Sequence, residues 1–430
     1  MKVAIATLGC KVNQSESSSI EGILRENNFE IVQHTDNPDI VIVNTCTVTA
    51  KSDYQSRQLI RKAVRSGAKV IATGCYAQLR PHELSIIEGL DLVLGNSAKH
   101  KIVDYIMSLP KKPGKPSIDV DLPGSPMVLQ PYHSSRTRAF LKIQDGCNFS
   151  CSYCAVPMAR GKSRSLSPED VLGAVKRLDS DGYKEIILTG IHIGSYGLDV
   201  QPKSSLVHLI GILTSANKHI RFRLSSIEPQ EFKSEILSYI KKGSMCAHLH
   251  IPLQSGSDYI LKEMHRGYTT SFYMELIDKI VSECPDISIG TDIIVGFPGE
   301  SEVDFTKTAD ILDRLPLSYF HVFPYSNRPG TQASLSANQV DKRISRERVK
   351  TLLELSRKKR ERYKARNVGR ILDIIVERNT GTDGRFIGIT DNYLRVSITS
   401  EGLIPGQRLK ARVISLTQSG LSAELLAQPL

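Results

Sequence analysis

The 430-residue sequence has no uninterrupted apolar run near the roughly 18 residues that a membrane-spanning helix needs. Its opening Met-Lys-Val-Ala-Ile-Ala-Thr lacks the long apolar stretch of a signal peptide and predicts a first strand instead. Apolar residues make up 40% and charged residues 23%, which excludes a fibrous, collagen-like or mostly disordered chain. We expect a cytoplasmic protein without membrane contact, of about two to four domains at about 150 residues each.

Cysteine is also scarce, and eight cysteines in so long a chain exclude a disulfide scaffold. In the cytosol, patterned cysteines more often bind metal or carry out redox chemistry. Cys246 and Cys284 have no motif around them and are interpreted as small buried apolar residues. The other six fall into two groups of three, which carry most of the functional signal.

Positive charge is in excess, with a formal net charge of +11. The excess is concentrated, because residues 341–370 hold thirteen Lys or Arg against four Asp or Glu. Such a segment is typical of a nucleic-acid footprint, although a solvated helix face with its own salt-bridge partners is an equal alternative. The charge alone does not separate these two interpretations.

Two segments of the chain alternate strands and helices. In the first, short β-rich runs at 2–7, 39–44 and 70–72 alternate with helical stretches at 16–28 and 54–66, which predicts an open parallel α/β sheet. In the second, six strands are expected at 140–144, 185–188, 220–224, 248–253, 288–295 and 319–323. Helical stretches such as 168–179 and 301–312 separate these strands. Six such units predict a partial (β/α)6 barrel with its site at the carboxyl ends of the strands.

A basic helix is expected at about 346–366, and five short strands follow it, at 371–377, 386–390, 394–398, 408–415 and 422–425. Five short strands in so little chain fit a small OB-like β-barrel. The stretch from about 110 to 131 is rich in Pro, Lys, Gly and Ser and predicts a linker. The expected division is therefore 1–112, a linker at 113–135, then 136–366 and 367–430.

The segment Gly146-Cys147-Asn148-Phe149-Ser150-Cys151-Ser152-Tyr153-Cys154 has the spacing C-x3-C-x2-C. Three thiolates on one loop suit three irons of a [4Fe-4S] cluster, and with no fourth cysteine nearby one iron stays open to an external ligand. Zinc is the main alternative, but three clustered cysteines without a fourth Cys or His suit it poorly. We refer to Cys147, Cys151 and Cys154 as the loop trio.

The second group consists of Cys10, Cys46 and Cys75, which we call the sheet trio. Each of the three follows a predicted parallel strand. Loops at the carboxyl edge of one parallel sheet lie near one another, so topology can bring these distant thiols into a second cluster site. Three unrelated loop thiols remain the alternative.

The loop trio followed by six β/α units resembles the radical S-adenosylmethionine (SAM) enzymes. The resemblance implies that the amino and carboxylate groups of SAM chelate the open iron and that electron transfer yields a 5′-deoxyadenosyl radical. A closed barrel mouth would then protect the radical from solvent.

The whole layout is similar to the methylthiotransferases, which have a three-cysteine domain, a radical-SAM barrel and a C-terminal TRAM domain. Matching stretches are Leu8–Gln14, Asn44–Thr49, Thr73–Gln78, the loop trio and Tyr325–Thr331. Within the family, Lys11-Val12-Asn13 and the loop Leu188–Gly194 resemble the branch that acts on N6-threonylcarbamoyladenosine at position 37, next to the tRNA anticodon. The other branches usually carry Pro-Lys-Asn or Gln-Met-Asn after the first cysteine.

The resemblance implies two [4Fe-4S] clusters, one on each trio, and replacement of the adenine C2 hydrogen by a methylthio group. It also implies that SAM is contacted by residues at the ends of the barrel strands. The residues that lie there, and that we expect to contact SAM, are Gly190, Ser226, Glu228, Gln254, Asp292 and Phe323. RNA contacts are expected in the densest basic run, at Arg357, Lys358, Lys359, Arg360 and Arg362. The implied partners are the tRNA anticodon stem-loop, a reductant such as flavodoxin or ferredoxin, and a sulfur donor that the sequence does not identify.

Three hypotheses follow. The first is the tRNA methylthiotransferase just described. The second keeps the chemistry but changes the substrate to an isopentenylated adenosine or a ribosomal-protein aspartate. The third is a non-enzymatic RNA-binding protein with structural clusters, which the open coordination position disfavours.

Overall fold

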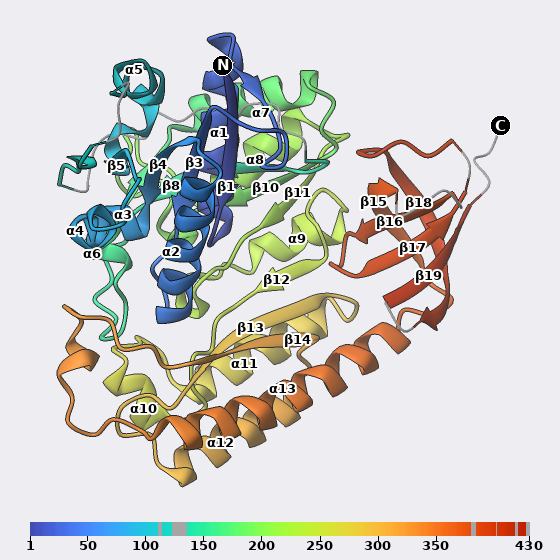
Figure 1. Cartoon of the computed structure of the whole chain (residues 1–430). Helices are drawn as coiled ribbons and strands as arrows, with labels where there is room; N and C mark the ends of the chain where they lie inside the picture. The colour runs from blue at the N-terminus through green and yellow to red at the C-terminus, as the bar shows by residue number, and fades with distance from the viewer. Residues whose placement is uncertain (111–113, 123–135, 380–383, 401, 418–419, 427–430) are drawn as a thin grey trace.

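The computed structural model describes residues 1–110, 114–122, 136–379, 384–400, 402–417 and 420–426 (Figure 1). Three units are visible: a parallel sheet covered by helices, a curved array of six β/α units, and a small barrel at the C-terminal end. The predicted fold class, with an N-terminal parallel α/β sheet, a partial (β/α)6 barrel and a C-terminal β-barrel, is confirmed. Among the described helices, none is long and apolar enough to cross a membrane.

The N-terminal sheet is parallel throughout, with the strand order β2-β1-β3-β4-β5-β6. Its strands are β1 (Lys2–Thr7), β2 (Glu30–Ile31), β3 (Ile40–Thr45), β4 (Lys69–Gly74), β5 (Leu92–Leu94) and β6 (Ser117–Asp119). The helices are α1 (Lys11–Glu26), α2 (Ala50–Arg65), α3 (Cys75–Leu79), α4 (Pro81–Ser85), η1 (Ser97–Lys101) and α5 (Ile102–Ser108). All six residues of β3 are buried, as expected for a central strand with helices on both faces.

The stretch expected as a linker, 113–135, contains one element of this sheet. Strand β6 pairs with β5 in parallel, with Val93 opposite Ile118. A three-residue edge strand gives almost no periodic signal in the sequence. The whole Pro-rich and Ser-rich stretch is therefore predicted as a linker, and β6 within it is missed. Residues 123–135 of that expected linker lie outside the described residues.

The six central strands form two parallel three-stranded sheets, β7-β10-β11 and β12-β13-β14, joined by bridges such as Ser226 to His250. The strands of this region are β7 (Ala139–Lys142), β8 (Gln144–Asp145), β9 (Arg164–Ser165), β10 (Glu185–Thr189), β11 (Arg221–Leu224), β12 (His248–His250), β13 (Ser288–Val295) and β14 (Tyr319–Pro324). The outer strands β7 and β14 do not pair with each other, so the barrel is partial. Helix α1 packs on the β7 side, where Lys142 N donates to Ser15 Oγ at 3.2 Å.

Helices cover the outside of these strands. They are α6 (Val156–Arg160), α7 (Pro168–Ser180), η2 (Ile193–Ser195), α8 (Leu206–Ala216), η3 (Pro229–Glu231), α9 (Glu235–Lys241), α10 (Asp258–Glu263), α11 (Thr270–Glu283), α12 (Glu302–Arg314), η4 (Gln332–Leu335) and α13 (Lys342–Ala365). Side-chain caps begin several of them. Ser301 Oγ, for example, accepts a hydrogen bond from Asp304 N at the start of α12.

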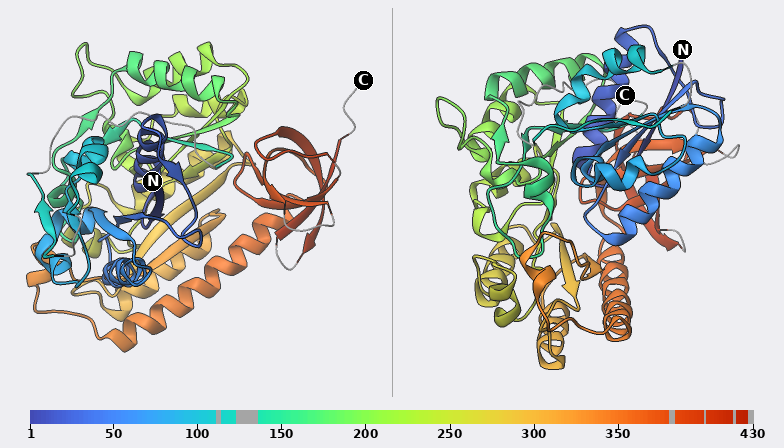
Figure 2. Two further views of the ribbon diagram at one scale, coloured as in Figure 1. Left: turned by 45° about the horizontal axis from the view of Figure 1, so that its top comes forward. Right: turned by 60° about the vertical axis from the view of Figure 1, so that its left-hand side comes forward.

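Helix α13 runs along the edge of the central unit to the C-terminal barrel, which stands at its far end (Figure 2). That barrel closes in the order β15-β16-β17-β19-β18. Its strands are β15 (Ile371–Asn379), β16 (Arg385–Thr390), β17 (Arg395–Thr399), β18 (Arg408–Thr417) and β19 (Gly420–Leu425). Buried guanidiniums attach it to the central unit. Arg223 pairs with Glu185 and also donates to the Thr390 carbonyl at 3.0 Å.

Candidate active site

The loop trio opens onto a cavity at the carboxyl ends of the central strands. The cavity has a volume of about 370 Å³, and Cys147, Cys151 and Cys154 all line it. The backbone fixes the loop, because Cys147 N donates to the Gly161 carbonyl at 3.0 Å and Ser152 N donates to the Met264 carbonyl at 3.2 Å. The three thiols are therefore held by a defined loop in the wall of this cavity.

Two of these thiols have nitrogen-bearing neighbours. Arg266 Nη1 lies 3.3 Å from Cys151 Sγ, and the same guanidinium pairs with Glu228. His192 Nδ1 lies 3.6 Å from Cys147 Sγ, and its Nε2 lies 2.7 Å from Glu231 Oε2. Burial disfavours the imidazolium of His192, but the hydrogen bonds with Cys147 and Glu231 outweigh it and raise the pKa to about 10.

Burial acts in the opposite sense on the thiols. It raises the pKa of Cys154 to about 12, and it raises that of Cys151 although Arg266 acts to lower it. Isolated thiolates would therefore be disfavoured here at neutral pH. A metal cluster reverses that preference, because coordination to a cation deprotonates a thiol outright.

Five of the six residues predicted to contact SAM line this cavity: Ser226, Glu228, Gln254, Asp292 and Phe323. Gly190 is not among the lining residues, whereas the next two residues, Ile191 and His192, are. A Cβ at Gly190 would lie 2.7 Å from Gln144 Oε1, the oxygen that accepts a hydrogen bond from His192 N. The geometry thus gives Gly190 a packing role that lets the His192 loop approach Gln144.

Arg266 was not identified from the sequence. It lies between α10 and α11, in a segment without a motif, and its importance comes from contacts with Cys151 and Glu228 that are far away in the chain. In the sequence, His192 is a candidate ligand, with a hydrogen-bonded structural histidine as the favoured interpretation. The His192 ring also lies 4.3 Å from the ring of Phe149, which is on the loop that carries the loop trio.

The sheet trio follows three adjacent strands, as the topology requires. Cys10 lies at the end of the loop that joins β1 to α1, Cys46 directly follows β3, and Cys75 is the first residue of α3, directly after β4. Cys46 and Cys75 are buried and Cys10 is exposed. Burial, with the neighbouring thiols of Cys75 and Cys10, raises the pKa of Cys46 to about 11. The three sulfurs therefore lie close enough to influence one another.

Gly9 shows how closely the chain packs at the sheet trio. Its φ is +106°, and a Cβ there would lie 3.0 Å from Cys46 Sγ. Glycine tolerates this left-handed conformation and leaves room for the thiol. The Leu8–Gln14 motif is thus explained locally by the turn that leads from β1 through Cys10 into α1.

The loop after β3 brings the sheet trio's domain to the cavity. Val48 and Thr49 follow Cys46 closely, and both line the same space as the loop trio. The motif Tyr325–Thr331 meets them there. Ala50 N donates to Ser326 Oγ at 2.9 Å, and Arg328 Nη1 lies 2.6 Å from Asp53 Oδ2. The cavity is therefore bounded by loops from two domains.

A buried ionic network, centred on Arg160, also joins the two domains. Its Nε lies 3.2 Å from Cys75 Sγ, its Nη2 donates to Asn13 Oδ1 at 2.7 Å, and its Nη1 lies 2.8 Å from Glu16 Oε1. Asp145 contacts the same guanidinium at 3.0 Å from the other domain. This network fixes the sheet trio relative to the loop trio.

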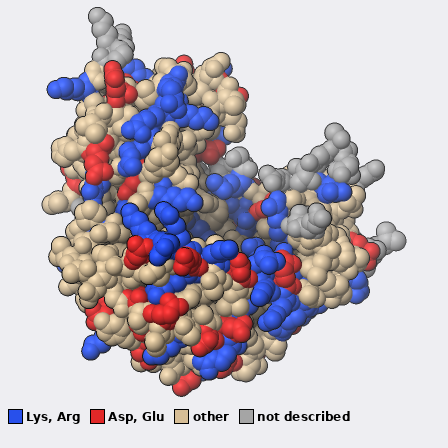
Figure 3. Space-filling model, turned by 60° about the horizontal axis from the view of Figure 1, so that its bottom comes forward, with Lys and Arg blue, Asp and Glu red and all other residues tan. Residues whose placement is uncertain are grey.

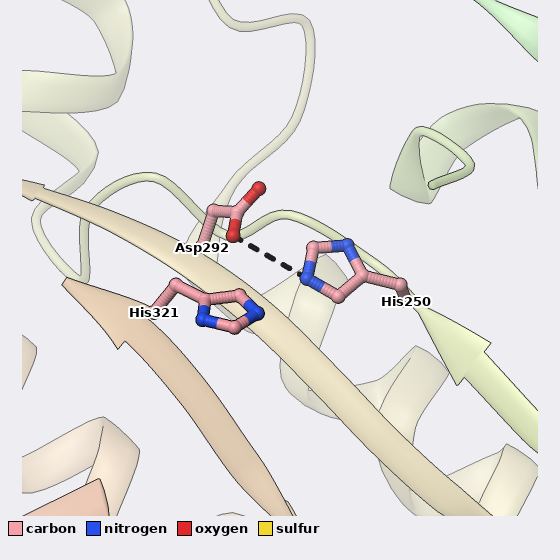
Figure 4. A group of neighbouring side chains, drawn as sticks. All are labelled: His250, Asp292 and His321. Carbon is pink, nitrogen blue, oxygen red and sulfur yellow. Dashed lines mark ion pairs between the residues drawn. The ribbon is translucent and has the colours of Figure 1, made fainter. Parts of the chain in front are cut away.

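The spacing of the thiols tests the zinc alternative. Among the described residues, three metal-binding donor atoms come within 4.8 Å of one another only at His250, Asp292 and His321 (Figure 4). Three thiolates on one zinc ion, with Zn–S of about 2.3 Å, would be more compact than that limit. Among the described residues neither cysteine trio meets it, so neither is arranged as a compact single-zinc site.

The residues predicted to contact RNA lie on α13. Arg357, Lys358, Arg360 and Arg362 are exposed. Lys359 is buried, and its ammonium donates to the carbonyls of Asp313 and Leu315, both at 2.8 Å, at the end of α12. Lys359 is thus a structural residue. Figure 3 shows Lys and Arg side chains around a hollow in this face and toward the C-terminal barrel, with acidic side chains among them.

Two regions of the chain match the models of known protein families. Residues 141–312 match the model of the radical SAM superfamily, and residues 2–95 match that of the uncharacterized protein family UPF0004. These regions contain the loop trio and the sheet trio respectively.

Curated relatives match nearly the whole chain. A threonylcarbamoyladenosine tRNA methylthiotransferase MtaB from Aquifex aeolicus is 40% identical over 92% of this chain and 96% of its own length. Its counterpart from Bacillus subtilis is 37% identical over 96% and 93%. A tRNA-2-methylthio-N(6)-dimethylallyladenosine synthase from Thermoanaerobacter pseudethanolicus is 33% identical over 87% and 81%.

Among solved structures, the radical S-adenosylmethionine methyltransferase TsrM from Kitasatospora setae is similar in fold. The TM-score is 0.56 at 14% identity, with 78% of this chain and 75% of that chain covered. At that identity the similarity concerns the fold alone.

Proposed function

Because this chain belongs to the radical SAM methylthiotransferases, we propose that it converts N6-threonylcarbamoyladenosine at position 37 of tRNA to its 2-methylthio derivative. The observation that carries the proposal is the shared cavity. One cavity is lined both by the loop-trio thiols and by Val48 and Thr49, which belong to the domain of the sheet trio. It is large enough to hold reacting groups between these two walls. Relatives named for this activity match over more than nine-tenths of the chain.

Family membership implies SAM and a [4Fe-4S] cluster, for which the loop trio supplies the thiolates. We propose a second [4Fe-4S] cluster on Cys10, Cys46 and Cys75. When bound, these groups would supply the 5′-deoxyadenosyl radical and the sulfur that is transferred. The sulfur donor is not identified, and a low-potential carrier such as flavodoxin or ferredoxin would supply electrons. We also propose a cytoplasmic site of action, where tRNA is modified.

The chain's own residues orient SAM and exclude water. Ser226, Glu228, Gln254 and Asp292 present polar groups from successive strand ends, while Phe323 adds an apolar wall. Arg266 holds the carboxylate of Glu228 in place by an ion pair. Preorganised polar groups in an enclosed space position a bound ligand without reorganisation during the reaction.

The proposal is tested with anaerobically reconstituted protein, SAM, a reductant and anticodon stem-loops carrying different adenosine modifications. A methylthio product on the threonylcarbamoyl stem-loop, detected by mass spectrometry of nucleosides, is expected. A methylthio product found only on the isopentenyl stem-loop would contradict the proposal that threonylcarbamoyladenosine is the substrate. Absence of 5′-deoxyadenosine from SAM would contradict the enzyme class.

The substitution Gly146→Ala is expected to reduce iron bound by the loop trio and to lower 5′-deoxyadenosine formation by at least about tenfold. Gly146 has φ of +73°, and a Cβ there would lie 2.0 Å from the Lys162 carbonyl oxygen, so the hairpin that carries Cys147 must open. Iron analysis and chromatography of SAM products measure the two effects.

Gly182→Ala is the matched control for that substitution. Gly182 has a similar φ of +90° but nothing within 4 Å of its Cβ position, so it tests backbone strain without the clash. Equal losses of iron in the two variants would show that the clash at Gly146 is unimportant.

We propose that the exposed basic residues of α13 bind RNA phosphates. Replacing Arg357 and Arg360 by glutamine should weaken stem-loop binding and reduce its salt dependence by about one unit of slope per contact. Fluorescence anisotropy at several salt concentrations provides the measurement. Lys359→Met is the control, since its ammonium is already bound by the Asp313 and Leu315 carbonyls. An unchanged salt slope in the double variant would remove α13 from the RNA site.

A further inference from the structure

The buried ionic network between the two domains carries a charge that its own members do not balance. The network consists of Arg160, Lys142, Lys99, Glu16 and Asp145, and all five are buried. Lys142 Nζ lies 2.9 Å from Glu16 Oε1 and 3.1 Å from Asp145 Oδ2. Lys99 Nζ lies 2.5 Å from Glu16 Oε2. Three cations therefore share two carboxylates, and one positive charge is left over.

The guanidinium of Arg160 has five N–H donors, and the structure gives each of them an acceptor. Nη1 donates to Glu16 Oε1 at 2.8 Å and to Asp145 Oδ1 at 3.0 Å. Nη2 donates to Asn13 Oδ1 at 2.7 Å and to Glu16 Oε2 at 3.2 Å. The fifth donor, on Nε, points at Cys75 Sγ at 3.2 Å. The one N–H that the oxygens leave over is therefore aimed at a cysteine of the sheet trio.

The surplus charge lies where an anionic group would meet it. Within the part of the chain that the structure describes, no third carboxylate forms an ion pair with the three cations of the network. A buried cation without a partner is costly, and a neutral thiol is only a weak acceptor. A [4Fe-4S] core with three thiolate ligands carries one negative charge overall in its oxidised form, which matches the surplus. The missing component is therefore an anionic group on Cys75.

The backbone of the sheet trio fits such a group. Gly9 and Gly74 each precede a cysteine of the trio, with φ of +106° and +96°. A Cβ at Gly9 would lie 3.0 Å from Cys46 Sγ, and one at Gly74 would lie 2.3 Å from the Thr45 carbonyl oxygen. Glycine tolerates these conformations and lets the three cysteine-bearing segments approach one another. Three thiols gathered at one sheet edge are the donor set that iron–sulfur clusters use.

The surroundings of the loop trio differ in their charge balance. Arg266, beside Cys151, forms an ion pair with Glu228. His192, whose Nδ1 faces the loop trio, has its Nε2 2.7 Å from Glu231 Oε2. Each nitrogen-bearing neighbour of the loop trio thus has a carboxylate of its own. The uncompensated positive charge is a property of the sheet trio.

We propose that Arg160 is a positioning residue for the sheet-trio cluster, whose Nε–H donates to the Cys75 thiolate and raises the reduction potential of that cluster. This inference rests on the proposed second cluster and adds the residue that tunes it. One-electron reduction, by the low-potential carrier of the proposed function, makes the cluster more negative. A hydrogen bond to a ligating sulfur and a nearby positive charge both favour the more negative form.

The test uses the full chain with the loop-trio cysteines replaced by alanine, so that reconstitution fills the sheet trio alone. A dithionite titration followed by EPR measures the reduction potential. Arg160→Lys keeps the positive charge but lacks Nε–H, and should lower the equilibrium constant for reduction about tenfold, or about 59 mV for one electron. Arg164→Lys is the matched control and should leave the potential unchanged. Arg164 approaches Asp145 at 3.6 Å and, among the described residues, contacts no cysteine.

A second measurement keeps Arg160 in place and decides the matter if Arg160→Lys binds less iron. Pulsed EPR of the reduced cluster, in the same chain made with isotope-labelled arginine, should detect a coupled arginine nitrogen and a proton that exchanges with deuterium oxide. An unchanged potential in iron-replete Arg160→Lys, or the absence of a coupled arginine nitrogen, would overturn the assignment. If the chain with Arg160 intact binds no iron at the sheet trio, the proposed second cluster itself fails, which is a distinct result.

Discussion

Replacing Cys46 by alanine is expected to abolish methylthio transfer while SAM is still cleaved to 5′-deoxyadenosine. Cys46 belongs to the sheet trio, and among the described residues its domain reaches the cavity through Val48 and Thr49. The loop trio, with its partners Arg266 and His192, is untouched by the change. Product formation should fall by more than about 100-fold, since even the outer partners of metal ligands are worth about 10- to 100-fold.

The experiment measures both products from one anaerobic reaction, the methylthio nucleoside and 5′-deoxyadenosine. Cys284→Ala is the control, because Cys284 is buried at the end of α11 and belongs to neither trio. It should leave both products at wild-type levels. Retained methylthio transfer in the Cys46 variant would show that the sheet trio is not part of the reaction.

The substitution Glu16→Gln is expected to destabilise the protein by about 3–5 kcal/mol. Glu16 is 2% exposed and contacts three cations: Arg160 at 2.8 Å, Lys142 at 2.9 Å and Lys99 at 2.5 Å. Without its charge, Asp145 is, within the part of the chain that the structure describes, the only remaining carboxylate in contact with Lys142 and Arg160. Breaking a buried network in this way leaves charges uncompensated, which costs far more than losing a surface pair.

Urea unfolding of the variant and of the wild type measures the difference. Glu21→Gln on the same helix is the control, because Glu21 forms a surface pair with Arg25 and should cost less than about 1 kcal/mol. Since Arg160 also contacts Cys75, the Glu16 variant should bind iron less well at the sheet trio. A loss no larger than that of Glu21→Gln would contradict the account of the network.

The same network predicts the dependence on pH. Burial alone would raise the pKa of Glu16, but Arg160, Lys142 and Lys99 together hold it well below its ordinary value. The stabilising contribution is therefore complete above about pH 4.3, the ordinary glutamate pKa, and is lost as the pH falls toward the depressed one. The difference in stability between wild type and Glu16→Gln should accordingly shrink below about pH 4.

Much of the fold could be predicted because the strands are strongly apolar and short. The predicted runs 2–7 and 288–295 coincide with β1 and β13, where nearly every residue is buried or half-buried. The sheet trio could be placed because parallel topology brings the ends of β1, β3 and β4 together. Edge strand β6 was missed because three residues carry no usable period.

The parts of the site that could not be predicted depend on contacts between distant segments. Arg266 gains its role only from contacts with Cys151 and Glu228, which are distant in the sequence, and nothing local to it signals that role. Lys359 is different, because a helical period could have identified it. It lies four residues before Tyr363 and seven after Leu352, both buried, and so belongs to the covered face of α13.

The central claim is that two separate thiolate trios each hold a cluster beside one cavity. Iron and acid-labile sulfide in the anaerobically reconstituted wild-type protein test it most directly. The account predicts about eight of each per chain, four for each [4Fe-4S] cluster. About four of each, unchanged in a variant that lacks Cys10, Cys46 and Cys75, would contradict it.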